Sequence, residues 1–269
     1  MISVDRAERI KRNQSLKTVA IRILDFLHLS NAARTVRTAA VRQMNRIRRS
    51  AQARLLWRWK PLVPEESFTV CCRNAIQLLH QSAGGGELGC YLEFGVSRGT
   101  SLACMYHALQ DKGLSNVRLI GFDSFRGLPP EAAREGWSPG AFWSARSATE
   151  RYLHQNGVDI SRVTLVEGWF KDTLTQTTAE RLGIKQASLI MIDCDIYSTS
   201  RDALWFCEAF IRDRAVLFFD DWGRPGAKKR RGQEDAFREF LAAFPALTAG
   251  PLPVGGGTAL PTRDAILLA

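Results

Sequence analysis

The sequence predicts an α/β fold in which a mostly parallel sheet carries helices on both faces. Five short apolar runs recur between residues 90 and 219, and each has the length of a strand and the composition of one buried on both faces. The stretches between these runs are long enough for helices that cross from one parallel strand to the next. A third observation concerns the positive charge, which is concentrated before residue 61. We therefore expect a basic helical segment ahead of the α/β domain.

Charge and composition divide the chain into two parts. Of the 269 residues, 45% are hydrophobic and 24% are charged, which suits one sizeable core and excludes disordered, collagen-like and disulfide-scaffold proteins. Residues 1–60 hold 15 Lys and Arg against three acids, a net of +12, so the rest of the chain is slightly acidic within the total of +10. Pro61 and Pro64 interrupt helix continuation. We expect a helical extension over residues 1–63 and one domain over 64–269.

The expected elements follow in order along the domain. The predicted strands are Cys90–Phe94, Val117–Phe122, Val163–Val166, Ser188–Ile192 and Ala215–Phe219. The predicted helices include Phe68–Gln81, Ser101–Lys112 and Thr199–Ile211. No run reaches the ~18 apolar residues of a membrane span, and the N-terminal apolar run lacks a signal cleavage site. Six cysteines without a CxxC pair indicate reduced, buried thiols, so a cytoplasmic protein is expected.

The first two strand ends carry residues suited to a ligand. Gly95 and Gly99 allow a tight turn and a close backbone approach, and Thr100 can cap the next helix. Glu93, just before the first glycine, favours a cationic ligand over a pyrophosphate. Asp123 ends the second strand, where a carboxylate can accept hydrogen bonds from a ribose diol. The structural alternatives are a plain strand-to-helix turn and an Asx turn.

The later strand ends carry aromatic and acidic residues. Trp169 and Phe170 follow the third strand and suit either contact with a purine or local core packing. Four acids follow the fourth and fifth strands, namely Asp193, Asp195, Asp220 and Asp221. Such acids repel one another unless a cation or hydrogen-bond donors lie between them, and oxygen ligands favour Mg²⁺, Mn²⁺ or Ca²⁺. The alternative is that they cap helices or pair with nearby Arg and Lys.

Together these segments resemble the class I S-adenosylmethionine-dependent methyltransferases, and more closely the macrocin O-methyltransferase family. The resemblance covers roughly residues 68–245 and implies a Rossmann-like fold whose seven-stranded sheet ends in an antiparallel strand, for which Asp264–Leu268 is the candidate. Cys194 departs from the family pattern, which usually has Gly between the two acids. The segments that carry the likeness are Tyr91–Ser101, Gly121–Pro130, Glu167–Leu174, Ile192–Ser198 and Phe219–Trp222.

The resemblance also implies which residues bind which group. Mg²⁺ is expected at Asp193, Asp220 and Asp221, where it would bind and orient a substrate oxygen, and Asp193 is also the expected catalytic base. The expected reaction is methylation of a hydroxyl on a small, sugar-bearing or polyhydroxylated molecule. The expected cofactor-binding residues are Glu93, Gly95, Ser97, Gly99, Thr100, Asp123, Ser124, Trp169 and Phe170.

Other interpretations remain open at this stage. Asp193 and Asp195 also form the DxD of nucleotide-sugar glycosyltransferases. The basic N-terminal arm suits a peripheral contact with anionic membrane, a solvated helix or a contact within a homo-oligomer. The absence of a base-reading motif argues against a nucleic-acid substrate. The segment from Pro129 to Tyr152 suits an active-site lid or packed surface.

Overall fold

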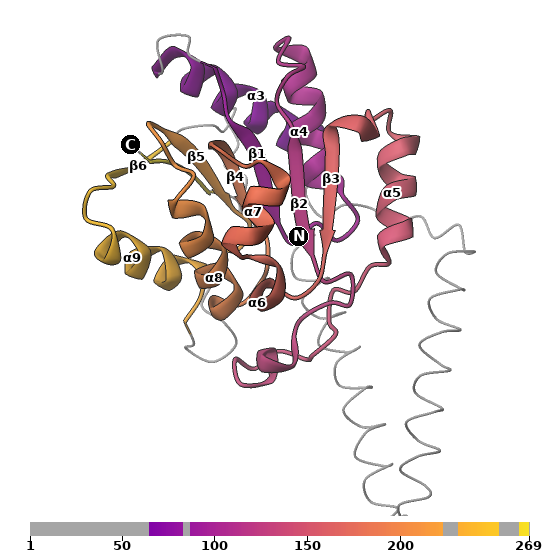
Figure 1. The fold of residues 1–269 in the computed structure, drawn as a ribbon, viewed down its shortest axis with the longest axis vertical. Helices are drawn as coiled ribbons and strands as arrows, with labels where there is room; N and C mark the ends of the chain where they lie inside the picture. The colour runs from indigo at the N-terminus through magenta and orange to yellow at the C-terminus, as the bar shows by residue number, and fades with distance from the viewer. Residues whose placement is uncertain (1–64, 83–86, 223–230, 253–263, 269) are drawn as a thin grey trace, which may run out of the picture. The chain divides into compact units, whose positions relative to one another are not determined.

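The computed structural model describes residues 65–82, 87–222, 231–252 and 264–268 (Figure 1). The predicted basic extension over residues 1–63 lies outside the described residues. None of the described helices is long and apolar enough to cross a membrane. All six cysteines are free and buried, which confirms the prediction of unpaired thiols.

The described strands form one sheet in the order β3-β2-β1-β4-β5-β7-β6. The first five strands of this order pair in parallel, and β7 runs antiparallel to both β5 and β6. The strand expected from the resemblance at Asp264–Leu268 is thereby confirmed. The strand bounds are β1 Cys90–Phe94, β2 Leu119–Asp123, β3 Val163–Glu167, β4 Ala187–Ile192, β5 Ala215–Phe219, β6 Ala249–Pro251 and β7 Asp264–Leu268.

Several predicted boundaries differ from the structure by one to three residues, and two of the differences have a local reason. The predicted second strand begins too early, since pairing with β1 starts at Leu119, opposite Tyr91. The helix predicted from Thr199 begins at Tyr197, because Ile196 is already extended at its N-cap. The helix bounds are α3 Glu65–Ser82, α4 Thr100–Asp111, α5 Arg146–Gln155, α6 Phe170–Thr173, α7 Gln176–Leu182, α8 Tyr197–Glu208 and α9 Gln233–Ala243, with short 3₁₀ helices at Pro130–Ala133 and Ile160–Arg162.

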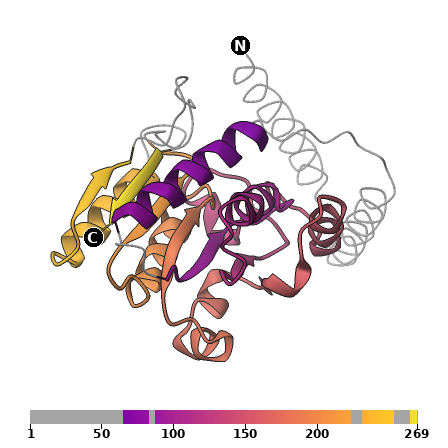
Figure 2. The same ribbon diagram turned by 90° about the horizontal axis from the view of Figure 1, so that it is seen from above.

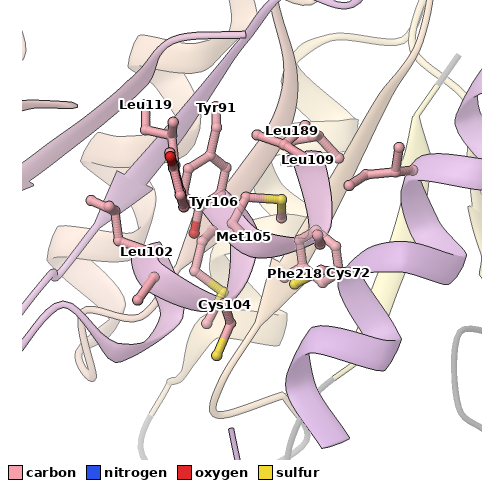
Figure 3. Close-up of a cluster of buried hydrophobic side chains, with 14 of the residues drawn as sticks. Cys72, Tyr91, Leu102, Cys104, Met105, Tyr106, Leu109, Leu119, Leu189 and Phe218 are labelled. Carbon is pink, nitrogen blue, oxygen red and sulfur yellow. The ribbon is translucent and has the colours of Figure 1, made fainter. Parts of the chain in front are cut away.

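Helices cover both faces of the sheet, as predicted. Successive residues of each parallel strand point to opposite faces, so Tyr91 packs with α3 and α4 while Leu92 packs with α7, α8 and α9. Figure 3 shows the first of these clusters, in which Tyr91, Met105 and Phe218 lie close together. Figure 2 shows α3 lying along one side of the sheet. The strands are therefore buried on both faces, which explains their continuous apolar runs.

The carboxyl ends of the five parallel strands share one edge of the sheet, and the backbone is strained there. Three non-glycine residues just beyond strand ends have positive φ: Ser97 at 47°, Phe125 at 49° and Asp195 at 64°. Such conformations persist only where surrounding contacts hold them, and they concentrate at functional sites. This edge is accordingly where a site should be sought.

Candidate functional site

The loop after β1 requires glycine at position 95. Gly95 has a φ of 94°, and a Cβ atom there would lie only 1.8 Å from the carbonyl oxygen of Asp193. The backbone N–H of Asp193 also donates to the carbonyl of Phe94 at 2.9 Å. The ends of β1 and β4 therefore touch through their backbones, and the absence of a side chain at Gly95 makes room for the Asp193 carbonyl.

Asp123 links the loops that follow β1 and β2. Its Oδ2 accepts a 2.8 Å hydrogen bond from the backbone N–H of Ser97, and its Oδ1 accepts one of 2.5 Å from that of Phe125. Burial raises the pKa of the Asp123 carboxyl; the amides of Ser97 and Phe125 oppose this shift, and nearby Glu167 adds to it. Each carboxylate oxygen still has a second lone pair that can accept a ligand hydroxyl.

Gly99 and Ser97 rest on α5. Gly99 is the left-handed N-cap of α4, with a φ of 84°, and a Cβ there would come within 3.0 Å of Thr149. The Thr149 hydroxyl donates to the carbonyl of Ser97. Thr100 is the first residue of α4. Helix α5 therefore stabilises the turn between Gly95 and Thr100 through its contacts with Ser97 and Gly99.

Glu93 lies beneath this turn and is inaccessible to solvent. Its two carboxylate oxygens accept hydrogen bonds from the hydroxyls of Tyr91, at 2.5 Å, and Ser101, at 2.7 Å. A buried carboxylate needs such donors to be tolerated. In this structure Glu93 thus anchors the start of α4 to β1.

Ser124 stabilises the turn that follows β2 through two hydrogen bonds of its hydroxyl. Its hydroxyl donates to the carbonyl of Gly127 at 2.8 Å and accepts from the backbone N–H of Arg126 at 3.0 Å. The side chain is buried. These contacts assign it a local role in shaping the turn, and a cofactor contact remains a prediction.

The two aromatic residues after β3 differ in environment. The Phe170 ring meets the Phe94 ring edge-on, with centroids 5.8 Å apart, and packs against the core between the sheet and α8. Trp169 is half-buried and precedes α6 as its N-cap. Phe170 therefore packs in the core, and contact of Trp169 or Phe170 with a cofactor stays a prediction.

The acids after β4 and β5 follow adjacent strand ends. The backbone N–H of Asp220 donates to the carbonyl of Ile192 at 3.2 Å, which brings Asp193 and Asp220 to neighbouring positions on the edge. Within the described ranges, however, no three His, Cys, Asp or Glu side chains are grouped so that they could hold a metal ion. Asp193, Asp220 and Asp221 therefore do not form a ready-made metal site in this arrangement.

Cys194 is compatible with the turn despite replacing the glycine of the family pattern. The positive φ of this turn falls on Asp195, one residue later. The Cys194 side chain is buried, and its Sγ lies 3.5 Å from the hydroxyl of Ser200. Burial raises the pKa of this thiol to about 12, so it stays protonated and unreactive at neutral pH.

The segment between β2 and α5, predicted as a lid or as packed surface, is packed. Leu128 and Ala132 form a small buried cluster with Ile196, and Trp137 and Phe142 pack against it. In Figure 1 this magenta segment extends below the sheet, beside α6. The segment therefore borders the edge that carries Asp193 and forms one side of the candidate site.

Two residues of the site were missed by the sequence analysis. Glu135, in the packed segment, accepts a 3.2 Å hydrogen bond from the backbone N–H of Ser198 at the start of α8. Gln233 is 1% exposed and bonds to the backbone at the ends of both β4 and β5. Their partners lie 12 to 63 residues away in sequence. No local motif marks either residue, and only the fold brings them to the edge.

The chain matches the sequence family described as a methyltransferase domain over residues 92–222. It is 31% identical to the 8-demethyl-8-(2,3-dimethoxy-alpha-L-rhamnosyl)-tetracenomycin-C 4'-O-methyltransferase of Streptomyces olivaceus, over 51% of this chain and 54% of that protein. The chain thus spans about half the length of this curated relative.

Two solved structures share the fold. The O-methyltransferase NovP superposes with a TM-score of 0.58 at 19% identity, covering 73% of this chain and 78% of that one. The calicheamicin methyltransferase CalS11 gives 0.57 at 21% identity, covering 73% and 77%. At these identities the likeness concerns the fold alone. From the family match over residues 92–222 and the shared fold, we conclude that this part of the chain is similar to the S-adenosylmethionine-dependent methyltransferases.

Proposed function

We propose that the protein is an O-methyltransferase that methylates a sugar hydroxyl of a small natural product. The observation that carries this proposal is the meeting of Gly95, Ser97 and Asp123 beside Asp193 at one edge of the sheet. This arrangement offers a glycine-lined surface, a ribose-binding carboxylate and an acid within one short span. The named activity of the Streptomyces olivaceus relative supports the sugar hydroxyl as the acceptor.

In this proposal the loops after β1, β2 and β3 bind S-adenosylmethionine, which supplies the methyl group from its sulfonium. The Asp123 carboxylate accepts the ribose hydroxyls, and Gly95 lets the methionine portion approach the backbone. Trp169 borders the adenine, with Phe170 behind it. The turns after β1 and β2 are stabilised by Glu93, Gly99, Thr100 and Ser124. The hydrogen bond from Ser97 to Asp123 joins the two turns.

On the acceptor side, Asp193 takes the proton of the hydroxyl that is methylated. It follows β4 directly, and its backbone carbonyl lies against Gly95. Holding the acceptor oxygen in line with the methyl group lowers the barrier through orientation, and removing its proton makes it a better nucleophile. The small-molecule acceptor enters beside the packed segment that contains Leu128 and Phe142.

Binding of Mg²⁺ at Asp193, Asp220 and Asp221 is a separate proposal. It rests on the sequence pattern and on the adjacency of the two strand ends, because the described side chains are not grouped for a metal. Removal of metal with EDTA, followed by addition of Mg²⁺, tests it. Loss and recovery of turnover support a metal, and unchanged turnover after EDTA contradicts it.

The proposed function is tested by calorimetry with S-adenosylhomocysteine and by methyl transfer to two probes, methyl α-L-rhamnoside and a nucleotide-linked rhamnose. We expect binding of S-adenosylhomocysteine and methylation of at least one probe. Asp193→Asn should abolish transfer and leave the affinity for S-adenosylhomocysteine within about twofold, because its backbone contacts are kept. Asp213→Asn, at an exposed position, is the matched control. A protein that binds a nucleotide sugar but not S-adenosylhomocysteine would contradict the proposal.

A further inference from the structure

Gln233 is a buried polar side chain that joins two strand ends. Its Oε1 accepts a 3.0 Å hydrogen bond from the backbone N–H of Asp221, just after β5. Its Nε2 donates to the carbonyl of Ile192, the last residue of β4, at 3.3 Å. The side chain is 1% exposed; its bond to Ile192 is buried, and its bond to Asp221 is part-buried. One amide group therefore connects the two segments that carry the acids of the site.

The position of Gln233 is itself firmly held. It is the first residue of α9, and the N-cap of this helix is closed by a 2.9 Å hydrogen bond from the backbone N–H of Gly232 to Asp235. Phe237, one turn farther along α9, packs against the rings of Phe219 and Trp222 at centroid distances of 5.4 and 5.5 Å. Movement of the Gln233 amide relative to β5 would disturb this packing. The amide is therefore held in place relative to the end of β5.

The same amide controls the placement of both acidic motifs. Ile192 immediately precedes Asp193, and its carbonyl accepts from Gln233 and from the backbone N–H of Asp220. Without the Gln233 side chain, the backbone N–H of Asp221 would lose the partner of this part-buried hydrogen bond. The turn after β5 would then shift toward solvent or toward a new acceptor, and the carboxylates of Asp220 and Asp221 would move with it.

We propose that Gln233 is a positioning residue that sets where the acids after β4 and β5 lie relative to the acceptor. This inference rests on the proposed function. Gln233 acts through Ile192 and Asp221, whereas the turns assigned to the cofactor are held by the Ser97–Asp123 bond. Its loss should therefore affect transfer to the acceptor and leave cofactor binding unchanged.

The test replaces the amide with an apolar side chain of similar length, in Gln233→Met. Gln176→Met is the matched control, because Gln176 is also the first residue of a helix but is exposed. Three quantities are compared with the wild-type protein: kcat with methyl α-L-rhamnoside or nucleotide-linked rhamnose, the Kd for S-adenosylhomocysteine, and backbone hydrogen exchange in its presence. If Gln233→Met fails to fold, Gln233→Asn, which keeps both amide functions on a shorter stem, takes its place.

We expect kcat to fall roughly tenfold or more in Gln233→Met, as misplacement of reacting groups typically causes. We also expect faster exchange confined to peptides that cover residues 190–195 and 219–222, and a Kd within about twofold. Unchanged exchange in these peptides overturns the inference, as does faster exchange throughout the domain together with weaker S-adenosylhomocysteine binding. If the wild-type protein binds S-adenosylhomocysteine but methylates neither probe, the proposed acceptor class fails, and the exchange comparison still decides the role of Gln233.

Discussion

The backbone N–H of Ser97 donates a 2.8 Å hydrogen bond to Oδ2 of Asp123, and this bond joins the turn after β1 to the end of β2. Ser97 has a φ of 47°, a conformation that needs support from its surroundings. The carboxylate of Asp123 and the hydroxyl of Thr149 provide that support from two sides. The two strand ends assigned to the cofactor therefore form one connected surface.

Asp123→Asn should weaken cofactor binding more than it weakens the fold. An asparagine side chain has one acceptor oxygen, so its NH₂ group would face either Ser97 or Phe125, each of which donates. It would also lack the charge that strengthens hydrogen bonds from a ribose diol. We expect the Kd for S-adenosylhomocysteine to rise by about tenfold or more, equivalent to ~1.4 kcal/mol, as measured by calorimetry. An unchanged Kd would exclude a contact between Asp123 and the ribose.

The raised pKa of Asp123 predicts a pH dependence of the same affinity. The ionised form accepts the ribose hydroxyls, so affinity should fall as the pH drops through a pKa that burial places above the usual value of ~3.9. The contribution of this group to folding has the opposite sign, since a raised carboxyl pKa favours the folded state at low pH and loses that effect as the pH rises. Calorimetry across mildly acidic pH should show weakening in the wild-type protein and less of it in Asp123→Asn.

Gly95→Ala should disrupt the site by a direct clash. The new Cβ would lie 1.8 Å from the carbonyl oxygen of Asp193, so β1 and β4 would have to separate. We expect a loss of folding free energy on the order of 3–5 kcal/mol and no measurable binding of S-adenosylhomocysteine. Gly113→Ala is the control, because Gly113 also has a positive φ of 71° but nothing lies within 4 Å of its Cβ position. That variant should lose about 1 kcal/mol and bind normally.

Most of the fold was predictable from the sequence, because the apolar runs that indicate the parallel strands are local features. The apolar runs predicted β1, β3, β4 and β5 to within a residue or two, since strands buried on both faces need continuous apolar sequence. β6, at Ala249–Pro251, went unpredicted. Three residues that include Gly and Pro carry no strand pattern, and only pairing with β7 defines them.

The site was predictable only in part. The sequence allowed Gly95, Asp123 and Asp193 to be placed near one another, because strand ends in parallel sheets meet at one edge; their roles stay predictions. The burial of Glu93 was not predictable, since it depends on hydroxyls of Tyr91 and Ser101 that lie on its own face of β1 and in α4. The sequence also could not predict whether the acidic side chains group around a metal, because the directions of these side chains depend on turns such as the one at Asp195.

Substitutions of Trp169 and Phe170 should distinguish a side chain that contacts the cofactor from one that only packs in the core. Phe170→Ala removes a ring that packs against Phe94, so we expect a loss of about 2 kcal/mol of stability in denaturant unfolding. Trp169→Ala should change stability by less than about 1 kcal/mol and raise the Kd for S-adenosylhomocysteine several-fold, because a half-buried ring before α6 is free to border the adenine. A Trp169→Ala protein with the wild-type Kd would remove Trp169 from the cofactor site.

Glu135→Ala should loosen the packed segment from α8. The carboxylate of Glu135 accepts the backbone N–H of Ser198, and Ile196, the N-cap of this helix, offers no capping side chain of its own. A carboxylate at this end of a helix also interacts favourably with the helix dipole. We expect a loss of about 1 kcal/mol, with faster hydrogen exchange in residues 128–142 and at the start of α8.

Glu131→Ala is the matched control for this change, because Glu131 lies in the same segment but is exposed and pairs only weakly with Lys171, at 4.0 Å. It should leave exchange and stability nearly unchanged. Since the segment borders the proposed acceptor side, Glu135→Ala should also raise the KM for the rhamnose probes while the Kd for S-adenosylhomocysteine stays constant. Equal exchange in the two variants would show that the cluster of Leu128, Ala132 and Ile196 holds the segment in place without the Glu135 hydrogen bond.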